Sequence, residues 1–180
     1  MKLFIASDIH GSALYCEQLL KQYEAERPDR FLLLGDILYH GPRNDLPIGY
    51  DPKKVIDLLN PLKDRIIAVR GNCDAEVDQM ILQFPIMADY NYICIDGIDI
   101  CLTHGHIYNQ SEPLPGHKDV LLCGHTHVPA CEECLGFVYI NPGSVSIPKA
   151  DSRHSYMIYQ DRVFYWKDLN SGNIYKEYEL

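Results

Sequence analysis

Short apolar segments that each end beside polar residues constrain the fold of this chain more than any other feature. Residues 2–7 (KLFIAS), 31–36 (FLLLGD) and 66–71 (IIAVRG) are typical of buried strands, since each is a brief run of apolar side chains. Amphipathic stretches at 12–26 and 52–60 separate these segments and predict helices. This alternation predicts a parallel sheet with helices packed against it.

The second half of the chain predicts strands with no helix between them. Residues 92–103 read as a hairpin around Gly97. Further strands are expected at 119–124, 137–141, 155–160 and 162–169. The sequence therefore predicts a layered α/β domain with one mixed sheet or two sheets face to face. With 180 residues, we expect residues 1–180 to form a single domain.

Composition and charge exclude several classes of protein. No apolar run approaches the length that spans a membrane, and the N-terminus lacks the features of a signal peptide. We therefore expect a cytoplasmic protein with no membrane partner. The formal net charge of −9 argues against a long nucleic acid as partner, because binding to a polyanion depends on lysine and arginine. A small anionic substrate remains compatible if a local positive site exists.

The seven cysteines are scattered and odd in number, which is not the pattern of a disulfide scaffold and fits a reducing compartment. Cys131 and Cys134 form the one close pair. No second pair matches it, and the two glutamates between them raise a thiol pKa, so we expect no metal or redox role.

Candidate metal ligands follow five of the predicted strands. In open α/β sheets, ligands bind in the crevice beyond the carboxyl ends of the strands. Carboxylate, imidazole and amide groups together suit divalent ions such as Mn²⁺, Fe²⁺, Zn²⁺ or Co²⁺. The candidates are numerous enough for two ions: Asp8, His10, Asp36, Asn72, His104, His125 and His127.

These residues carry a resemblance to a known family. Asp-x-His, Gly-Asp, Gly-Asn, His-Gly and Gly-His-x-His, in that order, resemble the motifs of the calcineurin-like metallophosphoesterase superfamily. The GDILYHGPRN, GNCD and NPGSVSIPK segments resemble most closely its small bacterial YfcE-type phosphodiesterases. The resemblance covers nearly the whole chain. It implies a four-layer αββα sandwich, with two mixed β-sheets flanked by helices and a site for two metal ions.

The resemblance also implies which residues hold each ion. The expected ligands of one ion are Asp8, His10 and His127, those of the other are Asn72, His104 and His125, and Asp36 bridges the two. Mn²⁺ is the expected ion, with Zn²⁺, Fe, Co²⁺ and Ni²⁺ as alternatives that the same ligands accept.

The implied activity is that of a metal-dependent phosphodiesterase acting on small phosphodiesters. Two ions roughly 3.5–4 Å apart hold a hydroxide near neutral pH, and this hydroxide attacks the phosphorus. Catalytic roles are expected for Asn72, Cys73 and His104, and substrate contacts for Arg43, Cys73 and His106. A solvated loop position is an equal alternative for Arg43, and Lys149 is expected on the surface. Other candidate functions are a phosphomonoesterase of the same fold and a non-catalytic protein-binding scaffold.

Cys73 departs from the family pattern, which commonly has a histidine at this position. A thiol with a pKa near 8.5 donates a proton poorly to a leaving group. We therefore expect substrates with good leaving groups, or a proton supplied by water or by His106. The alternative is that Cys73 is a small residue lining the pocket, and no base is obviously paired with it as a nucleophile. Asp74 is expected to orient a neighbouring residue.

Five tyrosines near the C-terminus admit two interpretations. They form either a homo-oligomer interface, where tyrosine is enriched, or one half-exposed face of a sheet. These residues are Tyr156, Tyr159, Tyr165, Tyr175 and Tyr178.

Overall fold

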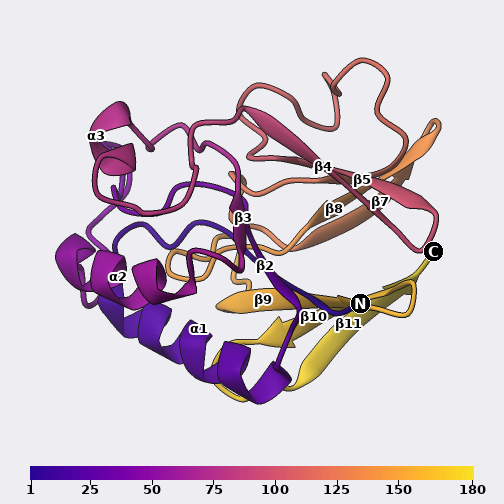
Figure 1. The fold of residues 1–180 in the computed structure, drawn as a ribbon. Coiled ribbons are helices and arrows are strands. Elements are labelled where there is room, and N and C mark those ends of the chain that lie inside the picture. Colours follow the sequence, from indigo (N-terminus) through magenta and orange to yellow (C-terminus); the bar gives the residue numbers. More distant parts are fainter.

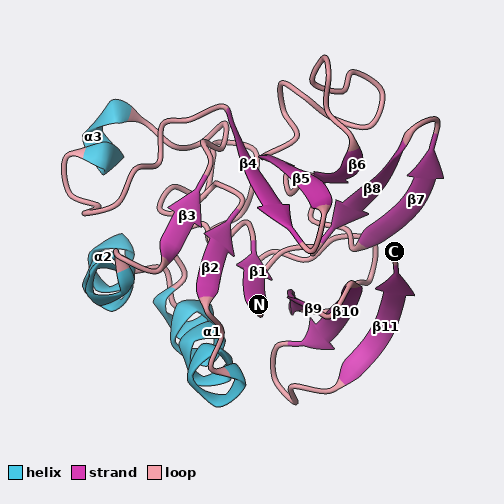
Figure 2. Cartoon of the chain, turned by 45° about the vertical axis from the view of Figure 1, so that its right-hand side comes forward, coloured by secondary structure: helices cyan, strands magenta, loops and turns pink.

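Two β-sheets lie face to face, and helices cover the outer face of only one of them (Figure 1, Figure 2). The computed structural model describes residues 1–180. The six-stranded sheet has the order β11-β10-β9-β1-β2-β3, and the five-stranded sheet has the order β4-β5-β6-β8-β7. Both sheets are mixed, as the sequence resemblance implied.

The strands of the six-stranded sheet are β1 (Leu3–Ala6), β2 (Arg30–Leu33), β3 (Ile66–Ala68), β9 (Ser155–Gln160), β10 (Val163–Asp168) and β11 (Ile174–Glu179). Those of the five-stranded sheet are β4 (Tyr90–Ile95), β5 (Ile98–Thr103), β6 (Asp119–Leu122), β7 (Ala130–Cys134) and β8 (Phe137–Asn141). The helices are α1 (Ala13–Glu26), α2 (Pro52–Leu59) and α3 (Glu76–Gln79), and a 3-10 turn spans Asn60–Leu62. None of the helices combines the length and apolar character needed to cross a bilayer.

Helices α1 and α2 begin where the sequence predicts, because each has a local start signal. The Ser12 side chain accepts a hydrogen bond from the backbone N–H of Tyr15 at the start of α1. Asp51 does the same for Lys54 at the start of α2, where Pro52 occupies the first helical position. The two helices lie in the crossovers that connect the parallel strands β1, β2 and β3.

Strand β1 is buried on both faces, which explains its uninterrupted apolar sequence. Phe4 and Ala6 belong to the core between the six-stranded sheet and the helices. Leu3 and Ile5 belong to the second core, between the two sheets. The six-stranded sheet is thus the central layer of the molecule.

The outer face of the five-stranded sheet is covered by the loop 105–118 instead of a helix. Leu114 from this loop packs on a small cluster that includes Cys101, Leu121 and Tyr139. Prolines on both sides of Leu114 prevent helix formation in this segment. The expected fold of two mixed sheets is therefore confirmed, but its fourth layer is a loop.

Two edge strands, β7 and β11, were not predicted from the sequence. Strand β7 (ACEEC) has two glutamates among its five residues, and β11 (IYKEYE) has three charged residues among its six. Each pairs on one side only, so neither needs the continuous apolar run of a central strand. Strand β11 shows no strict alternation, because its pairing with β10 shifts register between Trp166 and Lys167.

Only three of the five C-terminal tyrosines are accessible to solvent. Tyr156 and Tyr159 are fully buried on β9, which lies between β1 and β10, so these two side chains are core residues and not interface residues. Tyr165, Tyr175 and Tyr178 are half-buried.

Candidate metal centre

The ends of five strands from both sheets meet at one side of the molecule and bring the predicted ligands together. Strands β1, β2 and β3 lead into Asp8, His10, Asp36 and Asn72, and β5 and β6 lead into His104, His125 and His127. Five of these seven side chains are buried, which is rare for charged and polar residues without a ligand or partner. The half-buried His125 and the exposed Asn72 lie toward the solvent.

Backbone strain recurs at these strand ends. Left-handed conformations occur at Asp8, His10, Asp36, His125 and His127, with φ between 48° and 67°. Such angles are uncommon for residues with a Cβ and cluster at functional sites. Each one turns the chain sharply at the end of its strand, which lets neighbouring side chains point into the same cleft.

Two glycines allow the strand ends to approach one another. A Cβ at Gly71 would lie 2.1 Å from Oδ1 of Asp36. A Cβ at Gly124 would lie 1.9 Å from Oγ of Ser7 and 2.9 Å from Oδ2 of Asp8. Any larger residue at either position would push a candidate ligand out of place.

Backbone carbonyl groups set the tautomers of the three buried histidines. The Nδ1 atoms lie at hydrogen-bonding distance from carbonyl oxygens: His10 from Tyr39 at 2.8 Å, His104 from Leu34 at 2.6 Å and His127 from Ile147 at 2.6 Å. A carbonyl oxygen only accepts, so each Nδ1 carries the hydrogen. In the neutral ring, the Nε2 atom then carries a free lone pair. This is the arrangement found for histidines that bind metal ions.

Asp8, His10 and His127 form a first group of donor atoms, in which the lone pairs face one another. Nε2 of His127 lies 3.3 Å from Oδ1 of Asp8 and 3.2 Å from Nε2 of His10. Nε2 of His10 lies 3.7 Å from the same carboxylate oxygen. Oδ1 of Asp8 is buried and has no hydrogen-bond donor. A cation satisfies all three atoms, so these residues fit a divalent metal ion.

A second group of donors adjoins the first through Asp36. Oδ2 of Asp36 lies 3.7 Å from Nε2 of His10 and 3.4 Å from Nε2 of His104. The same nitrogen of His104 is 3.2 Å from Oδ1 of Asn72 and 3.3 Å from Nδ1 of His125. Asp36 thus lies between the two groups, and each group offers a carboxylate together with imidazole nitrogens.

The site attracts positive charge in the absence of any ion. Burial alone would lower the pKa of His104, but its hydrogen bond to Asp36 and the charges of Asp8 and Asp36 raise that pKa to about 9. Burial and the positive charge of His104 lower the pKa of His125 to about 4. The carboxylates Asp8 and Asp36 thus favour a positive charge at His104, and a metal ion bound there would displace its proton.

Asp74 holds the backbone around this centre, in the orienting role expected from the sequence. Its carboxylate accepts hydrogen bonds from the N–H groups of Asp36 at 2.8 Å, Ile37 at 2.9 Å and Gly71 at 2.7 Å. Burial raises the pKa of this carboxyl to about 6, against the lowering effect of those three donors. Asp74 thereby ties the end of β2 to the end of β3.

The segment 141–149 supports the centre in a way that sequence analysis missed. Ser144 and Ser146 donate their hydroxyl hydrogens to the carbonyl oxygen of Asp8, at 2.9 Å and 3.1 Å. The carbonyl of Ile147 accepts from Nδ1 of His127. Two serines spaced by one residue after Pro-Gly were the only local signal, and they gave no indication of which backbone they would reach.

A polar cleft of about 410 Å³ opens beside the donor atoms. Its lining contains no apolar residue. Arg43, from the loop 39–51, lines this cleft although it is exposed to solvent. Lys149, which was expected on the surface, is exposed and lines the same cleft. Two cationic side chains therefore stand at the rim of a site built from carboxylates and imidazoles.

Cys73 lies at the edge of the centre. Its N–H donates to Oδ1 of Asp36 at 2.8 Å, and its Sγ accepts from Nδ2 of Asn72 at 3.2 Å. Burial and the charge of Asp36 raise the pKa of the thiol to about 12, so the thiolate needed for nucleophilic attack is scarce near neutral pH. Its half-buried position in a pocket wall agrees with the simpler of the two roles predicted for it.

His106 is held against the centre without belonging to the donor groups. Its ring meets that of His104 edge to face, with centroids 5.3 Å apart. Burial and the positive charge of His104 lower its pKa. Its Nδ1 is buried and makes no hydrogen bond.

Comparison with known proteins agrees with this geometry. Residues 1–161 match the family model described as the calcineurin-like phosphoesterase superfamily domain. The chain is 45% identical to phosphodiesterase YfcE of Escherichia coli, over 97% of this chain and 95% of that protein. It is 27% identical to the probable metallophosphoesterase YsnB of Bacillus subtilis, over 88% of this chain and 83% of that protein. A solved structure of Yfce, a phosphoesterase from E. coli, superimposes with a TM-score of 0.95 at 44% identity, covering 99% of this chain and 98% of that one.

Proposed function

Because the chain belongs to the calcineurin-like phosphoesterase superfamily, we propose that it is a metal-dependent phosphodiesterase that hydrolyses small phosphodiesters, with residues 1–180 acting as one domain. One observation carries the proposal. Two adjoining groups of metal donors share Asp36 at the base of a cleft whose rim is cationic. Such a cleft binds a phosphate group although the chain as a whole has a net charge of −9.

We propose a dinuclear centre with Mn²⁺ as the resident ion. Asp8, His10 and His127 would hold one ion, Asn72, His104 and His125 the other, and Asp36 both. When bound, the ions lower the pKa of a water molecule and offset the charge that develops on the phosphate oxygens. The unpartnered Oδ1 of Asp8 and the fixed tautomers of His10 and His127 support this assignment.

We expect three of the chain's own side chains to orient the diester. Arg43 and Lys149 would contact the non-bridging phosphate oxygens from the rim of the cleft, where both side chains lie. His106 is a candidate substrate contact because its free Nδ1 lies beside His104. Asn72 and His104 would act in catalysis through the centre they share.

Cys73 takes the place of a histidine that would protonate the leaving group. Its raised pKa keeps the thiol protonated, but a weakly acidic thiol transfers a proton poorly. We therefore propose that substrates leave without its help, as good leaving groups do, or take a proton from water or His106. The net charge supports the further proposal that a long nucleic acid is not a partner, and we place the enzyme in the cytoplasm.

Hydrolysis by metal-stripped protein tests the proposal. Bis(4-nitrophenyl) phosphate and 4-nitrophenyl phosphate share one chromophore, and Mn²⁺, Co²⁺, Ni²⁺, Zn²⁺ and Mg²⁺ would be added back singly. We expect Mn²⁺ to restore activity and the diester to be preferred. A preference for the monoester would indicate a phosphomonoesterase. Tight metal binding by calorimetry with no hydrolysis of either ester would indicate a protein-binding scaffold.

A further inference from the structure

An apolar pocket of about 390 Å³ adjoins the metal centre. Eight of its eleven lining residues are hydrophobic, in contrast to the polar cleft. Cys73 lines the pocket, and its Sγ lies within 4.8 Å of donor atoms of His10 and Asp36. A molecule whose phosphate lies at the centre therefore has the mouth of this pocket directly beside it.

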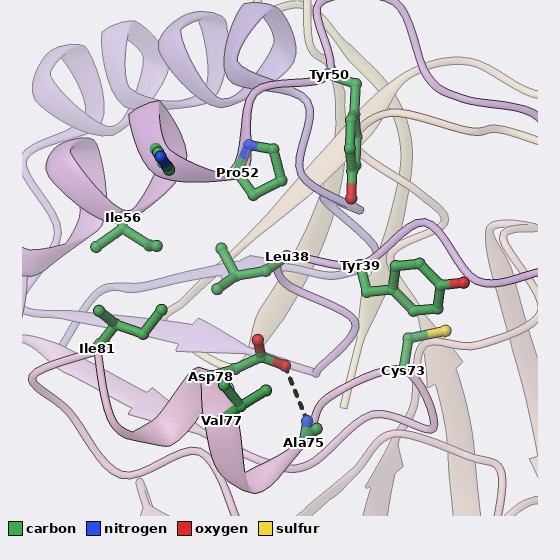
Figure 3. Close-up of a pocket in the computed structure, with 11 residues that line it drawn as sticks. Leu38, Tyr39, Tyr50, Pro52, Ile56, Cys73, Ala75, Val77, Asp78 and Ile81 are labelled. Atoms are coloured by element: carbon green, nitrogen blue, oxygen red, sulfur yellow. Dashed lines mark hydrogen bonds between the residues drawn. The ribbon is translucent and has the colours of Figure 1, made fainter.

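Figure 3 shows how the lining side chains are arranged along the pocket. Cys73 and Tyr39 lie at one end, and Ile56, Val77 and Ile81 lie at the other. The lining comes from the loop after β2, from α2, and from the segment that contains α3. These elements are separate in the sequence, so the pocket exists only in the folded chain.

The pocket offers few hydrogen-bonding groups to a ligand, and the hydroxyls of Tyr39 and Tyr50 are among them. Lys53 and Asp78 are the only charged residues in its lining. The Asp78 carboxylate is engaged with the N–H of Ala75 at 2.9 Å, and Lys53 is exposed to solvent. A group with several donors and acceptors, such as a nucleobase, would lose more hydrogen bonds to water on entry than these few groups replace. An apolar group has no such hydrogen bonds to lose.

Apolar side chains at the far end are exposed in the free protein. Val77 is 60% exposed and Ile81 is 48% exposed, although both are large aliphatic residues beside an open pocket. Removing such surface from water gives the main driving force for binding an apolar ligand. The volume is sufficient for a phenyl ring or a short alkyl chain.

We propose that this pocket binds an apolar alcohol group of the phosphodiester, aryl or alkyl, while the phosphate lies at the metal centre. The inference rests on the proposed phosphodiesterase function and adds the chemical class of the substrate. It also gives Cys73 a role: a compact, uncharged side chain keeps the passage between centre and pocket open and apolar. An imidazole would be larger and would bring a titratable group into that passage.

A series of mixed diesters with one leaving group tests the proposal. The 4-nitrophenyl esters of methyl, ethyl, butyl and phenyl phosphate all release 4-nitrophenolate, so only the retained group changes. We expect kcat/KM to rise about threefold for each added methylene group, mainly through KM. In Ile81→Asn and, separately, Val77→Asn, the ratio of phenyl to methyl kcat/KM should fall about tenfold. Leu135→Asn, at an exposed turn between β7 and β8, is the matched control and should leave the ratio unchanged.

Direct binding gives a second measurement that needs no metal and no turnover. The probe is 4-fluorophenol, a neutral aryl alcohol, titrated into metal-free protein and followed by fluorine NMR. We expect saturable binding to the native chain and to Leu135→Asn, and weakened binding to Ile81→Asn and Val77→Asn. Circular dichroism of each variant confirms that it is folded.

The outcomes separate this inference from the proposed function. Hydrolysis of the methyl ester with no dependence on the retained group would overturn the pocket assignment and leave the phosphodiesterase intact. Binding of 4-fluorophenol without hydrolysis of any diester would overturn the function instead. Dimerisation that Val77→Asn abolishes, with the phenyl to methyl ratio unchanged, would assign the apolar surface to a second copy of the chain and overturn the inference.

Discussion

The polar cleft and the apolar pocket have similar volumes, about 410 Å³ and 390 Å³, but they are built by opposite means. The cleft is lined without a single hydrophobic residue, and its donor atoms are held by buried hydrogen bonds at strained strand ends. The pocket is lined mainly by aliphatic and aromatic side chains from a loop and two helices, several of them exposed.

This difference indicates how each region tolerates change. Donor atoms that must meet within a few ångströms depend on every backbone turn that positions them, so single substitutions should be costly there. Apolar contact has no preferred direction and scales with area, so substitutions in the pocket should alter preference among substrates by modest factors. Four predictions test this contrast, in order of decreasing effect.

The largest effect is expected from Asp36→Asn, which breaks the link between the two groups of donors. An amide lacks the charge of the carboxylate and presents N–H hydrogens to the histidine lone pairs. We expect kcat/KM for bis(4-nitrophenyl) phosphate to fall at least about 10³-fold. Bound metal, measured by plasma mass spectrometry, should fall as well.

Asp45→Asn is the control for this variant, because Asp45 is exposed in the loop 39–51. It should retain native activity and metal content. Pocket binding of 4-fluorophenol should survive in Asp36→Asn, which would separate cleft from pocket. Near-native hydrolysis by Asp36→Asn would refute the shared-ligand assignment.

After removal of metal, the free energy of unfolding should depend on pH through a group of the cleft. The pKa of His104 is about 9 in the folded, metal-free chain, against about 6.5 when unfolded. Its stabilising contribution is therefore complete below pH 6.5 and is lost as pH rises toward 9. We expect urea denaturation of the stripped protein to show a loss on the order of 2–3 kcal/mol across that window.

The variant His104→Asn should lack this decline, since it removes the group that titrates. The native chain saturated with Mn²⁺ should also lack it, because the metal replaces the proton. Stability of the stripped native protein that is flat or rising between pH 6.5 and 9 would contradict the charge distribution assigned to the cleft.

Cys73→His alters the boundary between the two regions. A positioned imidazole can protonate a poor leaving group, so we expect about a tenfold gain on diesters of weakly acidic phenols. The dependence of kcat on the pKa of the leaving group should become shallower. Preference for a phenyl over a methyl retained group should fall, because the passage to the pocket is narrowed.

Cys73→Ser keeps the small size of the side chain without an imidazole, and it should behave like the native enzyme in the leaving-group series. If Cys73→His left both dependences unchanged, neither the proton-transfer hypothesis nor the role in the passage would stand.

An effect at the low end of this range is expected from Ser144→Ala, which removes a support outside the donor groups. The hydroxyl of Ser144 donates to the carbonyl of Asp8 and accepts from the N–H groups of Ser146 and Ile147. We expect a loss of about 1–2 kcal/mol in unfolding free energy and about a tenfold loss of Mn²⁺ affinity. Ser111→Ala, at an exposed position, should change neither quantity in the same titrations.

Much of this protein could be predicted from the sequence because the relevant signals are local. A buried strand needs only a short apolar run, and a helix start needs only a capping residue, so β1, α1 and α2 were found near their observed bounds. The strand-end positions of Asp8, Asp36 and the other candidate ligands were readable for the same reason, since each follows its strand directly in the sequence.

Tertiary structure decided what depends on distant partners. Nothing local reveals that Ser144 reaches the carbonyl of Asp8, 136 residues away, or that Leu114 covers the outer sheet without a helix. Strand β7 pairs only with β8, and its acidic sequence does not resemble that of a buried strand. The sequence therefore gives no indication of a strand there. The apolar pocket joins α2 to residues near α3 and the loop after β2, and Cys73 acquires its place between pocket and cleft only there. The sequence by itself determined which chemical groups lie at the strand ends, because each of these groups directly follows its strand along the chain. Which of those groups meet, and which apolar surface lies beside them, was decided by long-range packing of the two sheets.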